Sequence, residues 1–188
     1  MTHAAMTGTA SDVRPGAWTA DPASCSLAFA VQNFRLRTVT GRIPLVGATV
    51  HVDPGGRPVS IRAELDAAGI DTGHPRRDQD LRGRRFLATD RWPGITFEAD
   101  DIRPNETAWT VTGTLTVKDT RCPVQLDVAG FAIPADDAAT PVDLHATGRL
   151  DRRSAGVTTA PAFVVGHLVS LSLAVRLRPP AAAPARTA

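Results

Sequence analysis

Apolar and polar residues alternate along most of the chain with the two-residue period of a β-strand that buries one face. The clearest runs place apolar residues at every second position in the segments 27–31, 61–67, 95–99, 109–117, 124–128, 142–150 and 169–177. Repeats of this kind, separated by turn-length gaps, are typical of an antiparallel sheet with one solvated face. The pattern therefore predicts an all-β protein.

The alternation changes phase at Pro44. Apolar residues occupy odd positions from Val39 to Ile43 and even positions from Val46 to Val52. Such a change favours a bulge or bend, which curves a sheet toward closure. Because about eight strands with open edges must curl, stack or close, we predict a single antiparallel, lipocalin-like β-barrel of about eight strands with a short helical insert.

The interior of such a barrel is either packed solid or wide enough for one small apolar ligand. The large side chains predicted to line the lumen are Leu27, Phe29, Val31, Phe97, Trp109, Leu115, Leu126 and Leu171. Small residues such as Ala63, Gly113 and Ala146 share the inward phase. Small and large side chains can fill a tapered barrel together, or the small ones can leave a cavity, so both interiors stay open.

One arginine-rich segment, GIDTGHPRRDQDLRGRRFLATDRWPG (residues 69–94), interrupts the strand pattern. Pro75 suits the first turn of a helix, and acids precede bases in the order that complements the helix dipole. Asp78 with Arg82, and Asp80 with Arg84, have the spacing of ion pairs on a helix. The segment predicts a solvated helix that closes one end of the barrel.

A second hypothesis gives this segment a binding role. Arg77 or Arg82 would stand at the barrel mouth and contact a phosphate or another polar head group, for which a guanidinium is well shaped. Arg152 and Arg153 form a second candidate pair, with ordinary surface charge as the alternative. Nucleic acid is not expected as a partner, because the net charge is only +2 and acids and bases are interleaved.

Composition indicates one soluble domain. Hydrophobic residues make up 43% and charged residues 21%, and no apolar run approaches the roughly 20 residues of a spanning helix. We expect tails at residues 1–16 and 179–188 around a barrel domain at 17–178. The N-terminus has no signal-peptide pattern, which predicts a cytoplasmic location. Cys25 and Cys122 are expected to be buried thiols.

Catalytic and metal-binding motifs are missing from the sequence. The five histidines show no metal-ligand spacing, and there is no nucleophile elbow, P-loop or dinucleotide fingerprint. We therefore predict no catalytic residues, no metal and no cofactor. A site assembled across strands would escape such a search, because triads are recognised by geometry.

Four ordered motifs resemble the YceI-like family of polyisoprenoid-binding barrels. They are WTADPASCSLAFAVQNFRLRTVTGRI (18–43), DTGHPRRDQDLRGRRFLATDRWPGITF (71–97), VTGTLTVKDTRCPVQLDV (111–128) and GRLDRRSAGV (148–157). The resemblance extends from Trp18 to about Leu177. Where the family often carries a histidine after its Phe-x-Val, this chain has Asn33, which becomes a candidate head-group residue beside Arg77 and Arg82.

The resemblance implies a non-enzymatic protein that binds, sequesters or transports a long apolar lipid in the lumen. The implied ligands are an isoprenoid quinone, a polyprenyl phosphate or a related amphiphile. A homodimer is compatible with this reading. Two alternatives stay open: a small hydrolase or isomerase with a polar pocket in the same barrel, and a solid-core barrel that acts through its surface.

Overall fold

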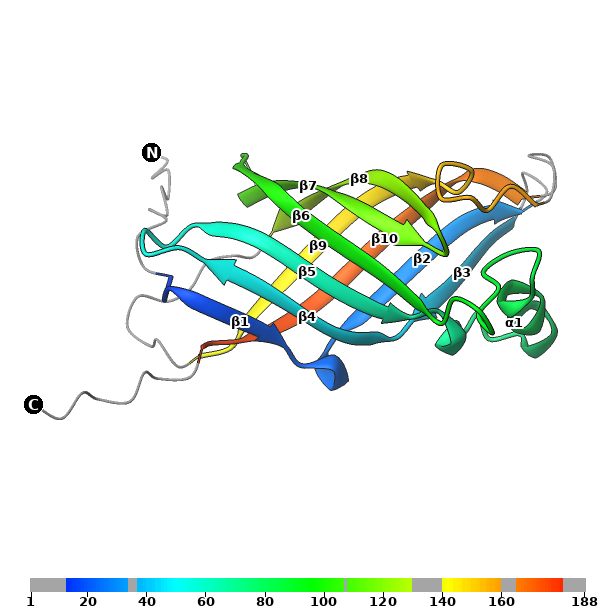
Figure 1. Ribbon diagram of the computed structural model, residues 1–188, viewed down its shortest axis with the longest axis horizontal. Coiled ribbons are helices and arrows are strands. Elements are labelled where there is room, and N and C mark those ends of the chain that lie inside the picture. Colours follow the sequence, from blue (N-terminus) through cyan, green and yellow to red (C-terminus); the bar gives the residue numbers. More distant parts are fainter. Residues whose placement is uncertain (1–12, 34–36, 107, 130–139, 160–164, 181–188) are drawn as a thin grey trace, which may run out of the picture.

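The computed structural model describes residues 13–33, 37–106, 108–129, 140–159 and 165–180, and it shows an antiparallel barrel with a helix at one end (Figure 1). The strands of the described residues are β1 (Gly16–Ala20), β2 (Ser26–Asn33), β3 (Arg37–Ile43), β4 (Leu45–Val52), β5 (Pro58–Asp66), β6 (Gly94–Pro104), β7 (Ala108–Val117), β8 (Thr120–Ala129), β9 (Val142–Asp151) and β10 (Val165–Arg178). Two 3₁₀ turns, η2 (Pro22–Ser24) and η3 (Ala67–Gly69), and the helix α1 (Pro75–Arg82) complete these elements. The predicted all-β class and the short helical insert are confirmed.

The sheet closes through strand β10. One edge of β10 pairs with β9, and the other pairs first with β2 and then with β1. β1 pairs with β4 and β2 pairs with β3, so β1 and β2 together fill one position in the ring, and β3 and β4 fill the next. The remaining neighbours follow the chain from β4 to β10. The ring therefore has eight positions, as predicted.

The bend predicted at Pro44 is present. β3 ends at Ile43 and β4 begins at Leu45, with a register shift between Leu45 and Gly47 against β5. Proline has no N–H to donate to a ladder, but its carbonyl accepts a hydrogen bond from the Asp66 N–H at 2.9 Å. The chain therefore turns at Pro44 without leaving that carbonyl unpaired.

The hydrophobic core runs along the inside of the barrel, and it includes the junction of β1 and β10 at the end away from α1 (Figure 1). Trp18 and Leu177 are 1% and 0% exposed. Val13 is also buried in this core, and the Trp18 indole N–H donates to the Arg14 carbonyl at 2.9 Å. Residues 1–12 and 181–188 of the predicted tails lie outside the described residues. The packed core thus extends to Val13.

The two cysteines differ in their surroundings. Cys122 is buried, and this burial raises the pKa of its thiol. Cys25 is only half-buried, so the expectation that both thiols are buried is wrong for this one. Cys25 directly follows the turn η2, before β2 begins, and its sulfur accepts a hydrogen bond from the Arg176 N–H at 3.3 Å. Cys25 therefore precedes strand β2 and does not take part in the alternation that points Leu27 into the barrel.

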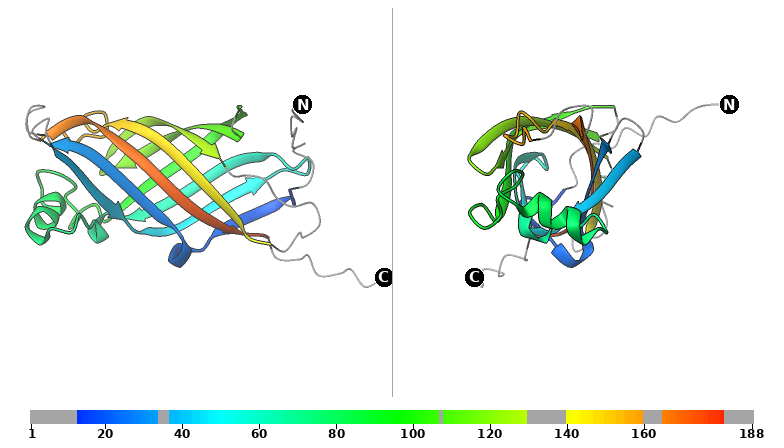
Figure 2. Two further views of the ribbon diagram at one scale, coloured as in Figure 1. Left: turned by 180° about the vertical axis from the view of Figure 1, so that it is seen from behind. Right: turned by 90° about the vertical axis from the view of Figure 1, so that its right-hand side faces the viewer.

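The insert between β5 and β6 covers the other end of the barrel. In the end-on view of Figure 2, α1 and its neighbouring loops lie across the opening of the ring. Among the helices of the described residues, none combines the length and the apolar character needed to traverse a bilayer.

Gly41 provides a test of the barrel packing. Phe29 lies opposite Gly41 in the β2–β3 register, and a Cβ at Gly41 would stand 2.7 Å from Phe29 Cε1 and 2.8 Å from Thr72 Cγ2. We expect Gly41→Ala to lower the free energy of unfolding by about 1–3 kcal/mol through overpacking, measured by urea denaturation. Gly47→Ala is the control, because nothing lies within 4 Å of the added methyl group. Equal losses in the two variants would contradict this packing.

Candidate functional site

An apolar cavity of about 180 Å³ lies inside the end of the barrel that carries the insert. The strands contribute part of its wall, and the insert covers it with Ile70, Leu81, Phe86 and Leu87. The loop after β9 adds Ala155 and Val157. The insert therefore closes one end of the barrel and also forms part of the cavity wall.

The cavity collects five of the eight residues predicted to line the lumen: Leu27, Phe29, Val31, Leu115 and Leu171. The other three, Phe97, Trp109 and Leu126, are absent from the wall formed by the described residues. Phe97 and Leu126 are buried in the packed core, and Trp109 packs against it.

Glycines on neighbouring strands explain where the interior is filled. A Cβ at Gly113 would stand 2.6 Å from Phe97 Cζ, and one at Gly148 would stand 2.6 Å from Leu126 Cδ2. Each large side chain thus occupies the space that a small neighbour leaves. The small inward residues therefore do not leave one continuous open lumen along the barrel.

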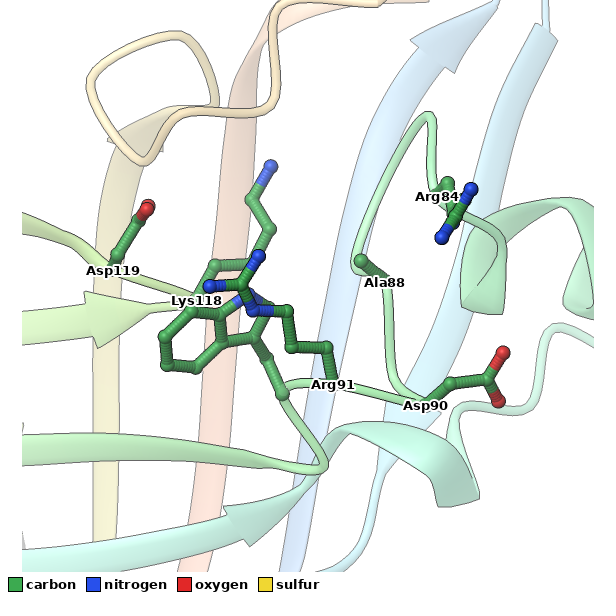
Figure 3. Close-up of a pocket in the computed structure, with 7 residues that line it drawn as sticks. Arg84, Ala88, Asp90, Arg91, Lys118 and Asp119 are labelled. Carbon is green, nitrogen blue, oxygen red and sulfur yellow. The ribbon is translucent and has the colours of Figure 1, made fainter.

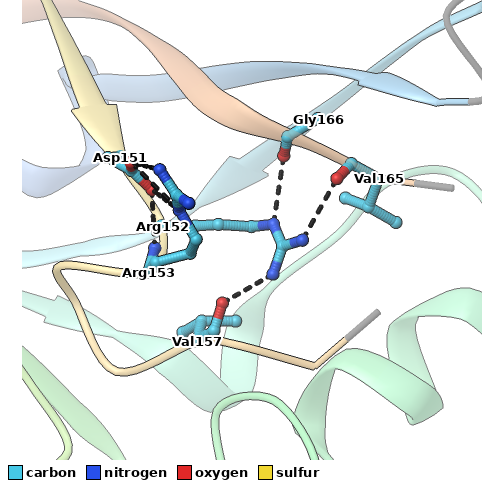
Figure 4. Close-up of polar contacts among 6 residues, drawn as sticks. All are labelled: Asp151, Arg152, Arg153, Val157, Val165 and Gly166. Carbon is cyan, nitrogen blue, oxygen red and sulfur yellow. Dashed lines mark hydrogen bonds and ion pairs between the residues drawn. The ribbon is translucent and has the colours of Figure 1, made fainter. Parts of the chain in front are cut away.

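The one charged side chain in the wall formed by the described residues is Arg152, which is 6% exposed. Its guanidinium group donates to four backbone carbonyls, three of them drawn in Figure 4. Nε reaches Gly166 O at 3.0 Å, and Nη2 reaches Val165 O at 3.1 Å. Nη1 reaches Val157 O at 2.7 Å and Thr159 O at 2.8 Å. Arg152 thereby ties the loop after β9 to the start of β10.

Burial distinguishes Arg152 from its neighbour Arg153. Removal from water lowers the pKa of Arg152, and the nearby Asp151 carboxylate partly opposes that shift. Arg153 is exposed and forms an ion pair with Asp151, whose pKa it holds well below the usual range. From the sequence, Arg152 and Arg153 form one candidate pair, because residue type and spacing do not show which of two adjacent arginines turns inward.

Arg77 and Arg82 of α1 are bound to nearby carbonyls. Arg77 donates to the hydroxyl and the carbonyl oxygen of Thr72, at 2.8 and 2.9 Å. Arg82 donates to Ala68 O at 2.6 Å and Ile70 O at 2.8 Å. Neither arginine belongs to the cavity wall that the described residues form. Both link α1 to the segment that precedes it.

The ion pairs predicted within the insert do not form. Asp78 is buried and accepts hydrogen bonds from the N–H and the hydroxyl of Thr72, which hold the pKa of Asp78 below its usual value. The ion pairs of the described residues lie elsewhere, and none joins Asp78 to Arg82 or Asp80 to Arg84. Arg84 lies beyond the end of α1, so it no longer has helical spacing to Asp80.

Asn33 lies at the same end of the barrel. It is the last residue of β2 and stands opposite Val165 of β10, whose carbonyl binds Arg152. Its side-chain Oδ1 is buried and accepts no hydrogen bond from the described residues. Asn33 is absent from the described cavity wall, so its predicted head-group role stays a prediction.

A closed antiparallel barrel of eight strand positions with an apolar cavity under one end defines a lipocalin-like barrel. The chain belongs to the YceI-like domain family, whose model matches residues 18–177. Curated relatives include a UPF0312 protein of Yersinia pestis (strain Pestoides F), which is 33% identical over 67 residues. That match covers 36% of this chain and 35% of the relative, so it spans about a third of either length.

Solved structures share the barrel at low sequence identity. Burkholderia cenocepacia BcnA superimposes with a TM-score of 0.73 at 20% identity, covering 84% of this chain and 98% of that one. A polyisoprenoid binding domain from Saccharophagus degradans superimposes with a TM-score of 0.64 at 13% identity, covering 87% and 98%. These likenesses establish the fold.

The adjacent arginines Arg152 and Arg153 allow a matched test of the site. We expect Arg152→Met to lower the free energy of unfolding by at least about 2 kcal/mol, because carbonyls of Val157, Val165 and Gly166 lose a charged donor. Arg153→Met removes only an exposed ion pair and should change the free energy of unfolding by less than about 1 kcal/mol. Both are measured by urea denaturation. Similar losses would contradict the structural role of Arg152.

Proposed function

We propose that this protein binds a polyisoprenoid or a similarly long apolar lipid in the barrel lumen, and sequesters or transports it without catalysis. The observation that carries the proposal is the cavity wall, which is apolar except for Arg152. Since four carbonyls already accept hydrogen bonds from that guanidinium, the cavity presents chiefly hydrocarbon to its occupant. Apolar occupants gain most in such a space.

Two comparisons support this ligand class. The chain belongs to the YceI-like family, and its structural neighbour from Saccharophagus degradans is described as a polyisoprenoid binding domain. An isoprenoid quinone, a polyprenyl phosphate or a related amphiphile would suit the site, with its head group at the mouth. The cytoplasmic location and the homodimer stay predictions.

The size of the cavity limits how much of a chain it holds. At about 180 Å³ it is little larger than an engineered cavity of about 150 Å³ that binds benzene, so it admits roughly one isoprene unit. Burying one unit of five carbons contributes roughly 4 kcal/mol, which corresponds to a Kd of about 1 mM. Tighter binding of a longer chain therefore requires side chains such as Leu81 and Phe86 to move outward.

The two alternatives receive less support. An enzyme would need a group that exchanges protons or attacks a substrate, and the described cavity wall carries no carboxylate, imidazole, thiol or hydroxyl group. A solid-core interaction module would have no cavity beneath the insert.

Chain length is the variable that tests the proposal. We expect the affinity for linear prenols, measured by displacement of a fluorescent fatty probe, to rise with each added isoprene unit beyond the first. The rise reflects further burial as the insert moves outward. Leu171→Trp should reduce the affinity for prenols, because the larger side chain fills the cavity. Leu168→Trp, at an exposed position, should leave that affinity unchanged. An absence of binding, or equal affinity at every chain length, would refute the proposal.

The head-group prediction has its own test. Arg77→Ala should weaken the binding of a prenyl phosphate and of the matching free prenol by the same factor, because Thr72 already accepts the hydrogen bonds of Arg77. Isothermal titration of the two ligands gives this comparison. A loss confined to the phosphate would instead assign Arg77 to the head group. Arg76→Ala, at an exposed position on the same helix, is the control.

A further inference from the structure

Positive charge is concentrated in the insert that covers the cavity. The insert, residues 67–93, contains six arginines and four aspartates, a surplus of two positive charges. The whole chain has a net charge of +2, so the rest of it is neutral overall. One end of an almost neutral barrel is therefore cationic.

The exposed arginines of this end form no ion pairs within the described residues. Elsewhere, Arg62, Arg103, Arg176 and Arg178 each form an ion pair with a carboxylate, whereas others such as Arg57 and Arg149 do not. Arg76, Arg84, Arg85 and Arg91 of the insert are exposed, and none forms an ion pair within the described residues. Their charges are therefore exposed to solvent.

Three of the cations surround one hollow of about 480 Å³ beside the mouth (Figure 3). Arg84 and Arg91 come from the loop after α1, and Lys118 comes from the hairpin between β7 and β8. The exposed Arg91 guanidinium lies over the ring of the half-buried Trp92, 5.1 Å from its centre, so a cation and an aromatic ring lie together beside the mouth. Asp90 and Asp119 also line the hollow, which leaves it with a net charge of +1.

From this arrangement we infer that the insert end of the barrel docks on the surface of an anionic lipid bilayer. Arg84, Arg85 and Arg91 face the lipid phosphates, while the Lys118 ammonium beside them donates to the Gly156 carbonyl at 2.9 Å. The cavity beneath Phe86 and Leu87 then opens toward the membrane. Arginine and tryptophan suit the boundary between water and lipid head groups. The inference rests on the proposed function, because an apolar ligand is exchanged with the membrane that dissolves it.

Docking accounts for the asymmetry better than a soluble anion does. A single phosphate needs one compact set of donors, whereas Arg76, Arg84, Arg85 and Arg91 spread along the helix and the loop that follows it. Attraction to a charged surface adds over such a spread and decays within a Debye length of about 10 Å. The opposite end, where Arg103, Arg176 and Arg178 are paired with carboxylates, would face away from the bilayer.

Cosedimentation with vesicles tests the inference on the full chain. We expect binding to vesicles of phosphatidylcholine and phosphatidylglycerol in equal parts, weak binding to phosphatidylcholine alone, and loss of binding as salt rises. The triple variant R84Q/R85Q/R91Q should bind the anionic vesicles on the order of a hundredfold more weakly, at roughly fivefold for each arginine. The matched control R62Q/R103Q/R176Q removes the same charge from the barrel wall and should bind nearly as well as the native chain.

Three results would overturn the inference. Equal losses in the two triple variants would assign the attraction to net charge alone. Displacement by inorganic phosphate beyond that by chloride of equal ionic strength would indicate a discrete phosphate site. Equal or tighter binding to duplex DNA, lost in the same variant, would make the surface a nucleic-acid site.

Docking and lipid binding can fail separately. Prenol binding in solution should be unchanged in R84Q/R85Q/R91Q, because none of these three residues belongs to the cavity wall that the described residues form. A native chain that binds prenols but ignores anionic vesicles would refute docking alone. A chain that binds the vesicles but no prenol would refute the proposed function and leave docking in place.

Discussion

The architecture depends on the pairing of β10 along both of its edges. A sheet of this size has two free edges unless its ends meet, and here the chain's last strand joins β9 to the first two strands. Trp18 and Leu177, among the most deeply buried side chains, lie at this closure. Because β10 pairs with β2 and β9 along the barrel, the ring stays closed around the cavity under the insert.

The division of the interior follows from pairs of large and small residues in register. Phe97 fills the space over Gly113, and Leu126 does the same at Gly148, so the middle of the barrel is packed. Toward the insert, apolar residues of the insert and of the loop after β9 complete a wall that strand residues begin. The cavity lies between these two regions, and Arg152 holds the loop that forms part of its wall.

Much of the barrel could be predicted from the sequence, because alternation is a local property of each strand. The bend at Pro44 could be predicted for the same reason, because the alternation changes phase there. The cavity was not, since it depends on which ring lies over which glycine across neighbouring strands. The ion pairs of Asp78 and Asp80 were predicted wrongly because helical spacing ignores competing partners: Thr72 takes the Asp78 carboxylate, and α1 ends before Arg84. Similarly, no pattern distinguished the buried Arg152 from the exposed Arg153.

The insert has an architectural consequence of its own. It is a single stretch of chain between β5 and β6, and its arginines Arg77 and Arg82 bind carbonyls of residues 68–72, within the same stretch. The strand pairings that close the ring do not pass through it. The insert is nevertheless fastened to the ring, because Asp71 forms an antiparallel bridge with Arg42 of β3.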